Sequence, residues 1–345
     1  MDLYGRDLIT TQEWSKQELE ATLDLAARMK RDRFSERYTS LLRHRTFFMF
    51  FYNPSVRTRQ SFEAAATELG GHAQFLEPKA MRLKTATSAG ETVEDAAKVM
   101  DGYAHGLGIR MLEDAIGEYG QGDALLREYA HWCKMPVISM AHDKFHPCQG
   151  LAEIMGWTEW LGNGPGQRLD LEKVRGKKLL VVWGHGALVR SWSSVQEALL
   201  IGSRFGMDVT LAHPEGFDLD PAVISWTQEN CAENGRTFAH THDLKQAYEG
   251  AHIVYSRHWM TPRAYQNGEL VKKPEIELAL GYPQWICDSE KMKWTDNAIF
   301  AHPMPVDRGH EVTDEVASGP RSCIYTVAEN RLHVQKAIMA MTMAS

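Results

Sequence analysis

Short apolar runs alternate with amphipathic stretches along most of the chain. The first clear case is residues 46–52, an almost wholly apolar and aromatic run bounded by turn residues, which predicts a buried strand. Apolar residues then recur at helical spacing from Phe62 to Leu69, and Gly70 follows where a C-cap glycine belongs. The pattern therefore predicts a strand, a tight turn and a helix.

The same alternation continues toward the C-terminus and predicts a parallel α/β sheet on each side of a break at residues 162–166. Further strands are expected at 72–76, 106–111, 136–140, 179–183, 207–212, 238–240, 253–256, 285–287 and 299–301. Helices are expected within 7–30, where Thr11 supplies the cap, and at 91–104, 122–132 and 147–161. We predict two doubly wound parallel-sheet domains joined by interdomain helices, with ligands at the carboxyl ends of the strands.

Composition narrows the class of protein. A chain of 345 residues with 43% hydrophobic and 24% charged residues suits two globular domains. The net charge of −7 argues against nucleic acid or an anionic membrane as a partner. The five cysteines are scattered without metal-ligand spacing, and no signal peptide or membrane-spanning run is found. We expect a soluble cytoplasmic protein.

The turn at residues 53–55 is a candidate anion site, because it leads directly into the predicted helix. Free backbone N–H groups and the positive helix end point at one spot there. Ser55, Arg57, Thr58 and Arg59 add hydroxyl and guanidinium donors. An ordinary helix cap with solvated charges is the alternative, but the density of donors favours a phosphate.

Two further sets of donors follow predicted strands. Arg110 ends a strand, so its guanidinium either caps a neighbouring helix or enters the ligand crevice. Pro147 suits the first turn of a helix, which leaves His146 just outside that helix and Gln149 on its first turn. A lone histidine is more often structural, but this pair beside an arginine can bind a carbonyl oxygen and an amide.

Four motifs resemble the aspartate/ornithine carbamoyltransferase family, in the family's order and over most of the chain. They are Ser55-Val56-Arg57-Thr58-Arg59, His146-Pro147-Cys148-Gln149, His302-Pro303-Met304-Pro305 with Arg308-Gly309-His310-Glu311-Val312, and the helix at 328–339 that contains Arg331. Val56 replaces the family's usual threonine, so one side-chain contact is lost while a backbone N–H remains.

The resemblance implies an enzyme that moves the carbamoyl group of carbamoyl phosphate to an amine without a cofactor. The implied catalytic residues are Arg57, Thr58, Arg110, His146 and Gln149. The implied carbamoyl phosphate site adds Ser55, Val56, Arg59, Met304 and Arg331. The family's C-terminal helix returns to the first domain, so we expect residues 1–150 with 325–345 to bind carbamoyl phosphate, and 151–324 to bind the acceptor.

The segment from Ser256 to Met260 bears on which amine is carbamoylated. It lacks the Asp-x-x-x-Ser-Met-Gly of ornithine enzymes and resembles the Lys-Ser-Trp of the N-acylornithine members, with Arg257 in place of lysine. Arg257 would then pair with an α-carboxylate. The expected acceptor is N-acetyl-L-ornithine or another N-acylornithine, in arginine biosynthesis, and the expected acceptor-binding residues are His142, Arg257, Trp259, Pro303 and Met304.

The sequence differs from the N-acylornithine members at two places, so other functions stay open. Residues 184–191 replace an expected proline-rich loop, and His142 stands where an acidic residue is expected. One alternative is that the acceptor is ornithine or another amine or ureido compound. The other is that the chain is a catalytically silent relative that binds carbamoyl phosphate. A nicotinamide-dependent dehydrogenase is disfavoured, because Gly184-His185-Gly186 lacks the third glycine and the acidic ribose partner of a dinucleotide fingerprint.

The polar loop at residues 79–88 bears on the quaternary structure. It is either a solvated mobile loop or, as the family implies, a segment whose Arg82 and Lys84 act in the neighbouring subunit's site. The family further implies a homotrimer with shared active sites.

No metal site is expected from the sequence. His213, His240 and His242 follow or end predicted strands, but strand-end histidines without matching second-shell acids are usually polar loop residues.

Overall fold

The computed structural model describes residues 2–78, 83 and 89–344. The chain divides into two compact units, Met1–Leu151 with Asn330–Ser345 (unit 1) and Ala152–Glu329 (unit 2). The boundaries fall within two helices, α5 (Pro147–Leu161) and α12 (Ile324–Met343). Each unit contains a parallel sheet with helices, which confirms the predicted fold class. Arg82 and Lys84 lie outside the described residues.

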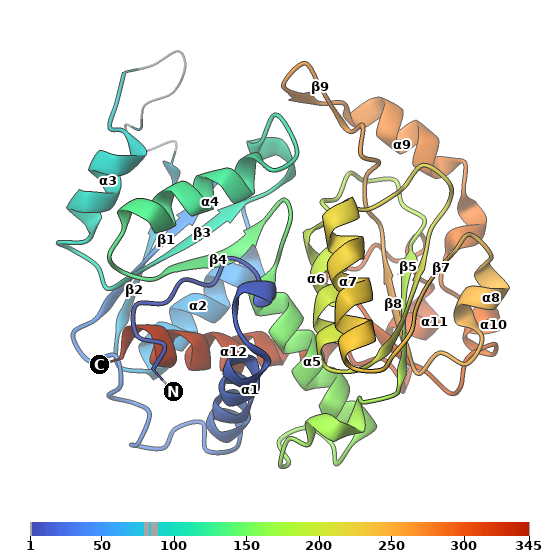
Figure 1. Ribbon diagram of the computed structural model, residues 1–345, viewed down its shortest axis with the longest axis horizontal. Helices are drawn as coiled ribbons and strands as arrows, with labels where there is room; N and C mark the ends of the chain where they lie inside the picture. The colour runs from blue at the N-terminus through green and yellow to red at the C-terminus, as the bar shows by residue number, and fades with distance from the viewer. Residues whose placement is uncertain (1, 79–82, 84–88, 345) are drawn as a thin grey trace. The chain divides into compact units, whose positions relative to one another are not determined.

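Unit 1 is built on a four-stranded parallel sheet with the order β2-β1-β3-β4. The strands are β1 (Thr46–Phe51), β2 (His72–Leu76), β3 (Gly106–Met111) and β4 (Val137–His142), and the helices between or before them are α1 (Lys16–Arg31), α2 (Val56–Glu68), α3 (Val93–Met100) and α4 (Gln121–Trp132). In Figure 1, α3 and α4 cover one face of this sheet, while α2 and α12 lie on the other. Strands β1, β3 and β4 are thus buried on both faces, whereas the edge strand β2 stays partly exposed.

Local chemistry sets the helix ends in unit 1. The Ser55 hydroxyl accepts a hydrogen bond from the Thr58 N–H (3.3 Å) and caps α2 at the predicted turn. Gly70 follows the helix with φ +81°, and a Cβ there would clash with the Thr39 carbonyl oxygen. The predicted cap of α1 at Thr11 is wrong: Thr11 begins a short 3₁₀ turn, and Ser15 caps α1.

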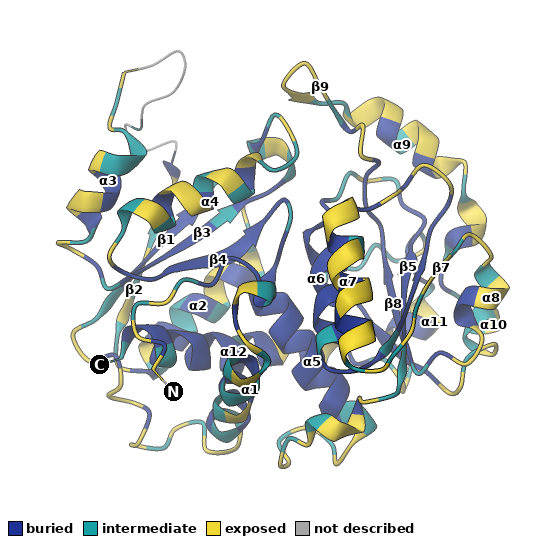
Figure 2. Cartoon of the chain, viewed as in Figure 1, coloured by how far each residue is buried: buried dark blue, intermediate teal, exposed yellow. Residues whose placement is uncertain are grey.

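Unit 2 is built on a five-stranded parallel sheet with the order β11-β8-β5-β6-β7. Its strands are β5 (Lys178–Trp183), β6 (Asp208–Ala212), β7 (Phe238–Thr241), β8 (Ile253–Arg257) and β11 (Ile299–Ala301), and a small hairpin pairs β9 (Tyr265–Gln266) with β10 (Glu269–Leu270). Its helices are α6 (Ser193–Arg204), α7 (Pro221–Glu233), α8 (Leu244–Tyr248), α9 (Lys272–Leu280), α10 (Ser289–Met292) and α11 (Asp314–Ala317). Figure 2 shows α6 almost wholly buried, whereas α7 and α9 carry exposed faces.

The strand predicted at residues 285–287 is wrong. Pro283–Trp285 forms a 3₁₀ turn, because proline has no N–H for a ladder and the Trp285 N–H donates locally to the Tyr282 carbonyl (3.1 Å). Only Cys287 makes an isolated bridge, to Val312. Among the described residues, no helix is both long and apolar enough to cross a membrane.

Candidate active site

The candidate anion site predicted at residues 53–55 lies between β1 and α2. Two hydrogen bonds attach it to the end of β3: the Tyr52 N–H donates to the Arg110 carbonyl (3.0 Å), and the Leu112 N–H donates to Asn53 Oδ1 (2.6 Å). The N-terminus of α2 and Arg110 therefore share the carboxyl edge of the sheet. This is the edge at which parallel sheets bind ligands.

Arg331, on α12, connects three of the sequence motifs within unit 1. Its guanidinium is buried and donates to Gln149 Oε1 (2.8 Å) and to Thr58 Oγ1 (3.3 Å). One of its nitrogens also lies 3.4 Å from His146 Nε2. With its amide oriented to satisfy both ends, Gln335 accepts from the same guanidinium at 3.2 and 3.3 Å. Sequence reasoning missed Gln335, although it lies one helical turn after Arg331.

His146 presents a donor to this cluster. Burial, followed by the positive charges of Arg331 and Arg110, holds the pKa of His146 well below its usual range, so the ring is neutral near pH 7. Because a guanidinium only donates, Nε2 accepts from Arg331 and the ring proton lies on Nδ1. Among the described residues, the buried Nδ1 has no hydrogen-bond partner, so its N–H is available to a ligand oxygen.

Positive charge accumulates around these donors. Burial, opposed by Glu113 and reinforced by the charge of Arg57, lowers the pKa of Arg110 to about 10, which leaves Arg110 cationic at neutral pH. Arg57 also lowers the pKa of His146, so its guanidinium lies near both groups. Arg110 Nε is buried and unpaired within the part of the chain that the structure describes. Such a cluster suits a small dianion.

Arg59 points to a neighbouring region. Its guanidinium pairs with Glu63 (3.0 Å) and lies 3.9 Å from the centre of the Phe75 ring. With Ser55 and Val56 it lines a hollow of about 1160 Å³ in unit 1, and the Val56 side chain is 68% exposed. Ser55 and Val56 therefore adjoin this hollow, whereas Thr58 faces Arg331.

His142 ends β4 and is fully buried in unit 1. Its Nδ1 lies 2.8 Å from Ser139 Oγ, and its Nε2 lies 3.3 Å from Asp123 Oδ1. Burial opposes ionisation of Asp123, but His142 and Arg127 outweigh it and lower the pKa of that carboxyl to about 2. The structure thus gives His142 interior partners, and its expected contact with the acceptor stays a prediction.

The predicted acceptor residue Arg257 lies in a second polar cluster, in unit 2. Its guanidinium is 3.1 Å from Glu311 Oε1 and 3.2 Å from the Pro305 carbonyl oxygen. Glu311 also accepts from the His258 N–H and the Asp307 N–H, both at 2.8 Å. Burial opposes ionisation of Glu311, but His302 and Arg257 outweigh it and hold its pKa well below the usual range. Glu311 is therefore a buried carboxylate with a full set of donors.

The turn formed by residues 302–305 is attached to the Glu311 carboxylate through His302. His302 Nε2 lies 2.9 Å from Glu311 Oε2, and the Met304 N–H donates to His302 Nδ1 (2.8 Å). The ring is therefore neutral, with its proton on Nε2. Sequence analysis included Glu311 only as part of a motif and gave it no role of its own.

Two of the three other expected acceptor residues, Trp259 and Pro303, are buried. Trp259 is fully buried, its indole N–H donates to the Phe217 carbonyl (2.8 Å), and its own carbonyl accepts from Trp183 (3.0 Å). Pro303 is buried and Met304 is partly exposed. The glycines that resemble a dinucleotide motif serve packing instead, because a Cβ at Gly186 would lie 2.7 Å from the His258 ring.

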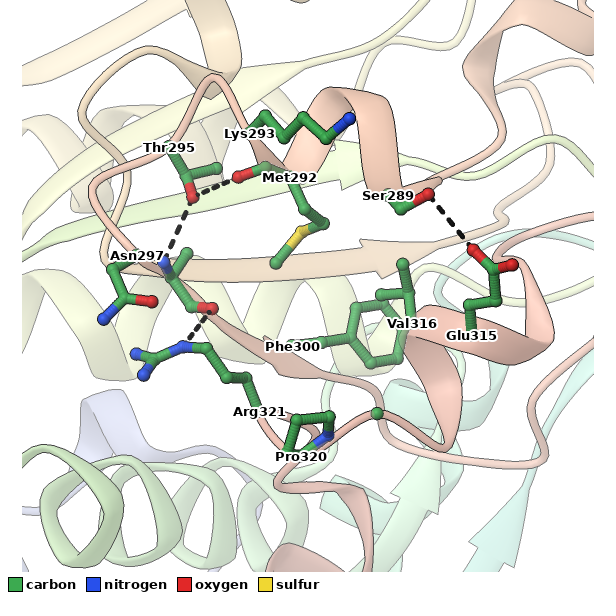
Figure 3. Close-up of a pocket in the computed structure, with 12 residues that line it drawn as sticks. Ser289, Met292, Lys293, Thr295, Asn297, Phe300, Glu315, Val316, Pro320 and Arg321 are labelled. Atoms are coloured by element: carbon green, nitrogen blue, oxygen red, sulfur yellow. Dashed lines mark hydrogen bonds between the residues drawn. The ribbon is translucent and has the colours of Figure 1, made fainter.

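A further hollow of about 460 Å³ lies in unit 2 between α10, β11 and α11 (Figure 3). Three of its polar side chains pair with one another or with backbone: Ser289 with Glu315 (3.2 Å), Arg321 with the Ala298 carbonyl (3.0 Å) and Thr295 with the Met292 carbonyl (2.7 Å). It is lined by Ser289, Met292, Lys293, Thr295, Asn297, Ala298, Phe300, Glu315, Val316, Gly319, Pro320 and Arg321. No residue of the predicted site lines it.

Known proteins resemble the chain over nearly its full length. Residues 6–159 match the carbamoyl-P binding domain of aspartate/ornithine carbamoyltransferases, and residues 176–342 match their Asp/Orn binding domain. The N-acetylornithine carbamoyltransferase of Xanthomonas campestris pv. campestris is 34% identical, with 97% of each chain covered. The ornithine carbamoyltransferase of Thermococcus kodakarensis is 33% identical, with 99% of this chain and 98% of that relative covered.

Solved structures agree with this result. An acetylornithine transcarbamylase complexed with acetylcitrulline gives a TM-score of 0.88 at 34% identity, covering 99% of this chain and all of that one. A mutant N-acetyl-L-ornithine transcarbamylase, complexed with carbamyl phosphate and N-succinyl-L-norvaline, gives a TM-score of 0.86 at 34% identity, covering 97% of this chain and 99% of that one. Together the motifs, both matched domains and these relatives show that the chain belongs to the aspartate/ornithine carbamoyltransferase family.

Proposed function

We propose that this protein transfers the carbamoyl group of carbamoyl phosphate to the amine of N-acetyl-L-ornithine or another N-acylornithine. The observation that carries the first half of the proposal is the cluster around Arg331. It joins Thr58, His146 and Gln149 to a neighbouring pair of arginines, Arg57 and Arg110. Phosphate alone does not need the donors that face a carbonyl group, so the set favours carbamoyl phosphate and a catalytic protein over a silent relative.

The proposed chemistry assigns a task to each group. The amine nitrogen attacks the carbonyl carbon, the bond from that carbon to the phosphate oxygen breaks, and phosphate takes up the amine proton. The N-terminus of α2, with Ser55 and Arg57, holds the phosphate and its growing charge. Arg110 and the His146 Nδ1–H donate to the developing oxyanion. Fixed positions for both reactants lower the entropic part of the barrier.

The acceptor half rests on unit 2 and on the relatives. Arg257 is a buried cation whose Nε has no partner among the residues described, which leaves one edge of the guanidinium for an α-carboxylate. Relatives named as N-acetylornithine carbamoyltransferases match at 34% identity. Ornithine is the second candidate acceptor, because ornithine carbamoyltransferases match at 33% identity. The expected contributions of Trp259, Pro303 and Met304 stay predictions.

We further propose a cytoplasmic homotrimer that acts in arginine biosynthesis, with Arg82 and Lys84 contributing to a neighbouring subunit's site. The resemblance to the family supports this arrangement. Gel filtration combined with an activity assay across dilutions tests it. A trimer that loses activity as it dissociates is expected, and a fully active monomer would contradict the proposal.

The acceptor is tested by measuring phosphate release and carbamoylated product from carbamoyl phosphate with separate candidate amines. The panel is N-acetylornithine, N-succinylornithine, ornithine, aspartate, putrescine and ureidoglycolate. We expect the highest kcat/KM with an N-acylornithine. Higher kcat/KM with ornithine would favour the second candidate, and absence of turnover with every amine would contradict the proposed activity.

A further inference from the structure

Three histidines meet at one end of the unit 2 sheet. One ring nitrogen from each of His213, His240 and His242 lies within 4.8 Å of the others. His240 lies in β7 and His242 directly follows that strand, and their ring centroids are 5.0 Å apart. The strand register pairs Leu211 with His240, which brings His213, just after β6, beside them. Because β7 is the edge strand of the sheet, the group lies at the sheet margin (Figure 1).

Backbone hydrogen bonds orient two of the three rings. His213 Nδ1 lies 2.8 Å from the Pro214 carbonyl oxygen, and His242 Nδ1 lies 2.7 Å from the His213 carbonyl oxygen. A carbonyl only accepts, so both rings donate from Nδ1 and carry the lone pair on Nε2. Metal-binding histidines are oriented in the same way, and a backbone carbonyl serves as well as a carboxylate. The second-shell acids sought in the sequence are therefore not required.

The third ring needs a small rearrangement. His240 Nε2 lies 2.8 Å from His213 Nε2, so in this structure His240 donates its proton to the lone pair of His213. Metal–nitrogen bonds of about 2.0–2.1 Å in a tetrahedral site place the nitrogens about 3.4 Å apart. Opening by roughly half an ångström, with the His240 proton on Nδ1, would turn both lone pairs toward one ion. The exposed His240 side chain has room to move.

The surroundings favour an ion supplied from solvent. His213 is fully buried and is held against Trp259, with ring centroids 6.1 Å apart, so one ligand is rigid. His240 and His242 are exposed, which gives the ion a path of entry. The carboxylate of Asp218 interacts with the charges of His213 and His240, and its negative charge stabilises a cation there.

We propose that His213, His240 and His242 bind a divalent transition-metal ion of the zinc class, with water completing a tetrahedral shell. Three imidazoles select such ions over Mg²⁺ and Ca²⁺, which prefer oxygen ligands. The ion connects the edge strand β7 to β6 and stabilises the margin of unit 2. The test of this site measures metal binding and stability, so it does not depend on the proposed function.

The test uses the full chain without an affinity tag, stripped with EDTA and titrated with Co²⁺. We expect one equivalent to produce the visible absorption of tetrahedral cobalt, which Zn²⁺ then removes by displacement. Zn²⁺ is also expected to raise the melting temperature. Removing an outer-shell partner of a metal typically weakens its binding about 10- to 100-fold. His240→Asn and His242→Asn each remove a direct ligand, so each should weaken cobalt binding by at least that much. His72→Asn, an exposed histidine on β2, is the matched control and should bind as wild type does.

Both ligand variants change exposed side chains, and equal melting temperatures in EDTA check that they fold. Circular dichroism gives the folded fraction of each variant, and the cobalt absorbance is divided by it. The cobalt affinity of a partly unfolded variant can then still be compared with that of the wild type. Cobalt binding that is the same in the wild type and in both variants would overturn the proposal. So would a wild-type protein that binds no cobalt in a tetrahedral site.

Discussion

The two polar clusters of this protein differ in how their charges are balanced. In unit 1, Arg331 donates to neutral side chains, and Arg57 and Arg110 add positive charge beside it. In unit 2, Arg257 faces the buried carboxylate of Glu311, which also accepts from His302 and two backbone N–H groups. The first cluster carries excess positive charge and two unpaired donors, whereas the second neutralises the charge of Arg257 and leaves only its Nε unpaired among the described residues.

This difference separates a binding role from a structural one. Buried donors without partners are costly unless a ligand satisfies them, so His146 Nδ1 and Arg110 Nε indicate a site that awaits an anion. Glu311, by contrast, fixes the turn that contains Met304 and determines where Arg257 lies. Substitutions in the first cluster should therefore reduce activity, whereas substitution of Glu311 in the second should reduce stability.

The largest effect is expected for Glu311→Gln. Removing the charge leaves Arg257 buried without its counter-ion, which typically costs about 3–5 kcal/mol. We expect the midpoint of urea unfolding to fall accordingly. Glu315→Gln, an exposed carboxylate on α11, is the matched control and should change the free energy of unfolding by less than about 0.5 kcal/mol. Equal unfolding midpoints for the two variants would contradict the structural role of Glu311.

Arg57→Ala should affect activity and leave stability nearly unchanged. Loss of one donor to a developing charge lowers kcat by about 10²–10³-fold or more. The side chain is partly exposed, so the free energy of unfolding should change by less than about 1 kcal/mol. Steady-state kinetics with urea unfolding measures both. Arg31→Ala, an exposed arginine at the end of α1, should alter neither, and near-normal activity of Arg57→Ala would refute the phosphate site.

Arg331→Lys tests the geometry of the first cluster with its charge retained. A lysine ammonium cannot span Thr58, His146 and Gln149 together as the guanidinium does. Misplacing these groups by about 1 Å should lower kcat by about 100-fold. Pre-steady-state kinetics separates this loss from weaker binding. If the Arg331→Lys variant keeps full activity, the cluster needs only a positive charge at this position.

The smallest effect is expected for Val56→Thr, which restores the hydroxyl found in the family motif. One added hydrogen bond contributes about 0.5–1.5 kcal/mol, so the KM for carbamoyl phosphate should fall by about 2- to 12-fold. Val99→Thr, at an exposed valine on α3, is the control and should leave KM unchanged. An unchanged KM for Val56→Thr would place this side chain away from the phosphate.

Much of the fold was predictable because apolar strands and capped helices carry local signals. Residues 106–111 form the strand expected there, and Ser55 caps α2 at the turn predicted to precede that helix. The segment 285–287 was mispredicted because an apolar run does not reveal that the Trp285 N–H pairs locally. Local patterns thus define elements better than they define which backbone groups pair.

The sites were less predictable because their contacts join distant segments. The donors at two predicted helix starts indicated Thr58 and His146, and the resemblance to the family implied Arg331. Only the fold shows that Arg331 contacts the other two. Glu311 received no role of its own, because a carboxylate becomes structural only through partners distant in sequence. The histidine cluster likewise depends on the register of β6 and β7.

The most direct test of the central claim is a calorimetric titration of freshly prepared carbamoyl phosphate into the wild type and Arg57→Ala. If the arginine-rich cluster of unit 1 is the carbamoyl phosphate site, the wild type binds one equivalent per chain. Arg57→Ala should then bind at least about tenfold more weakly, which corresponds to about 1.4 kcal/mol. The same dissociation constant for both proteins would contradict the account.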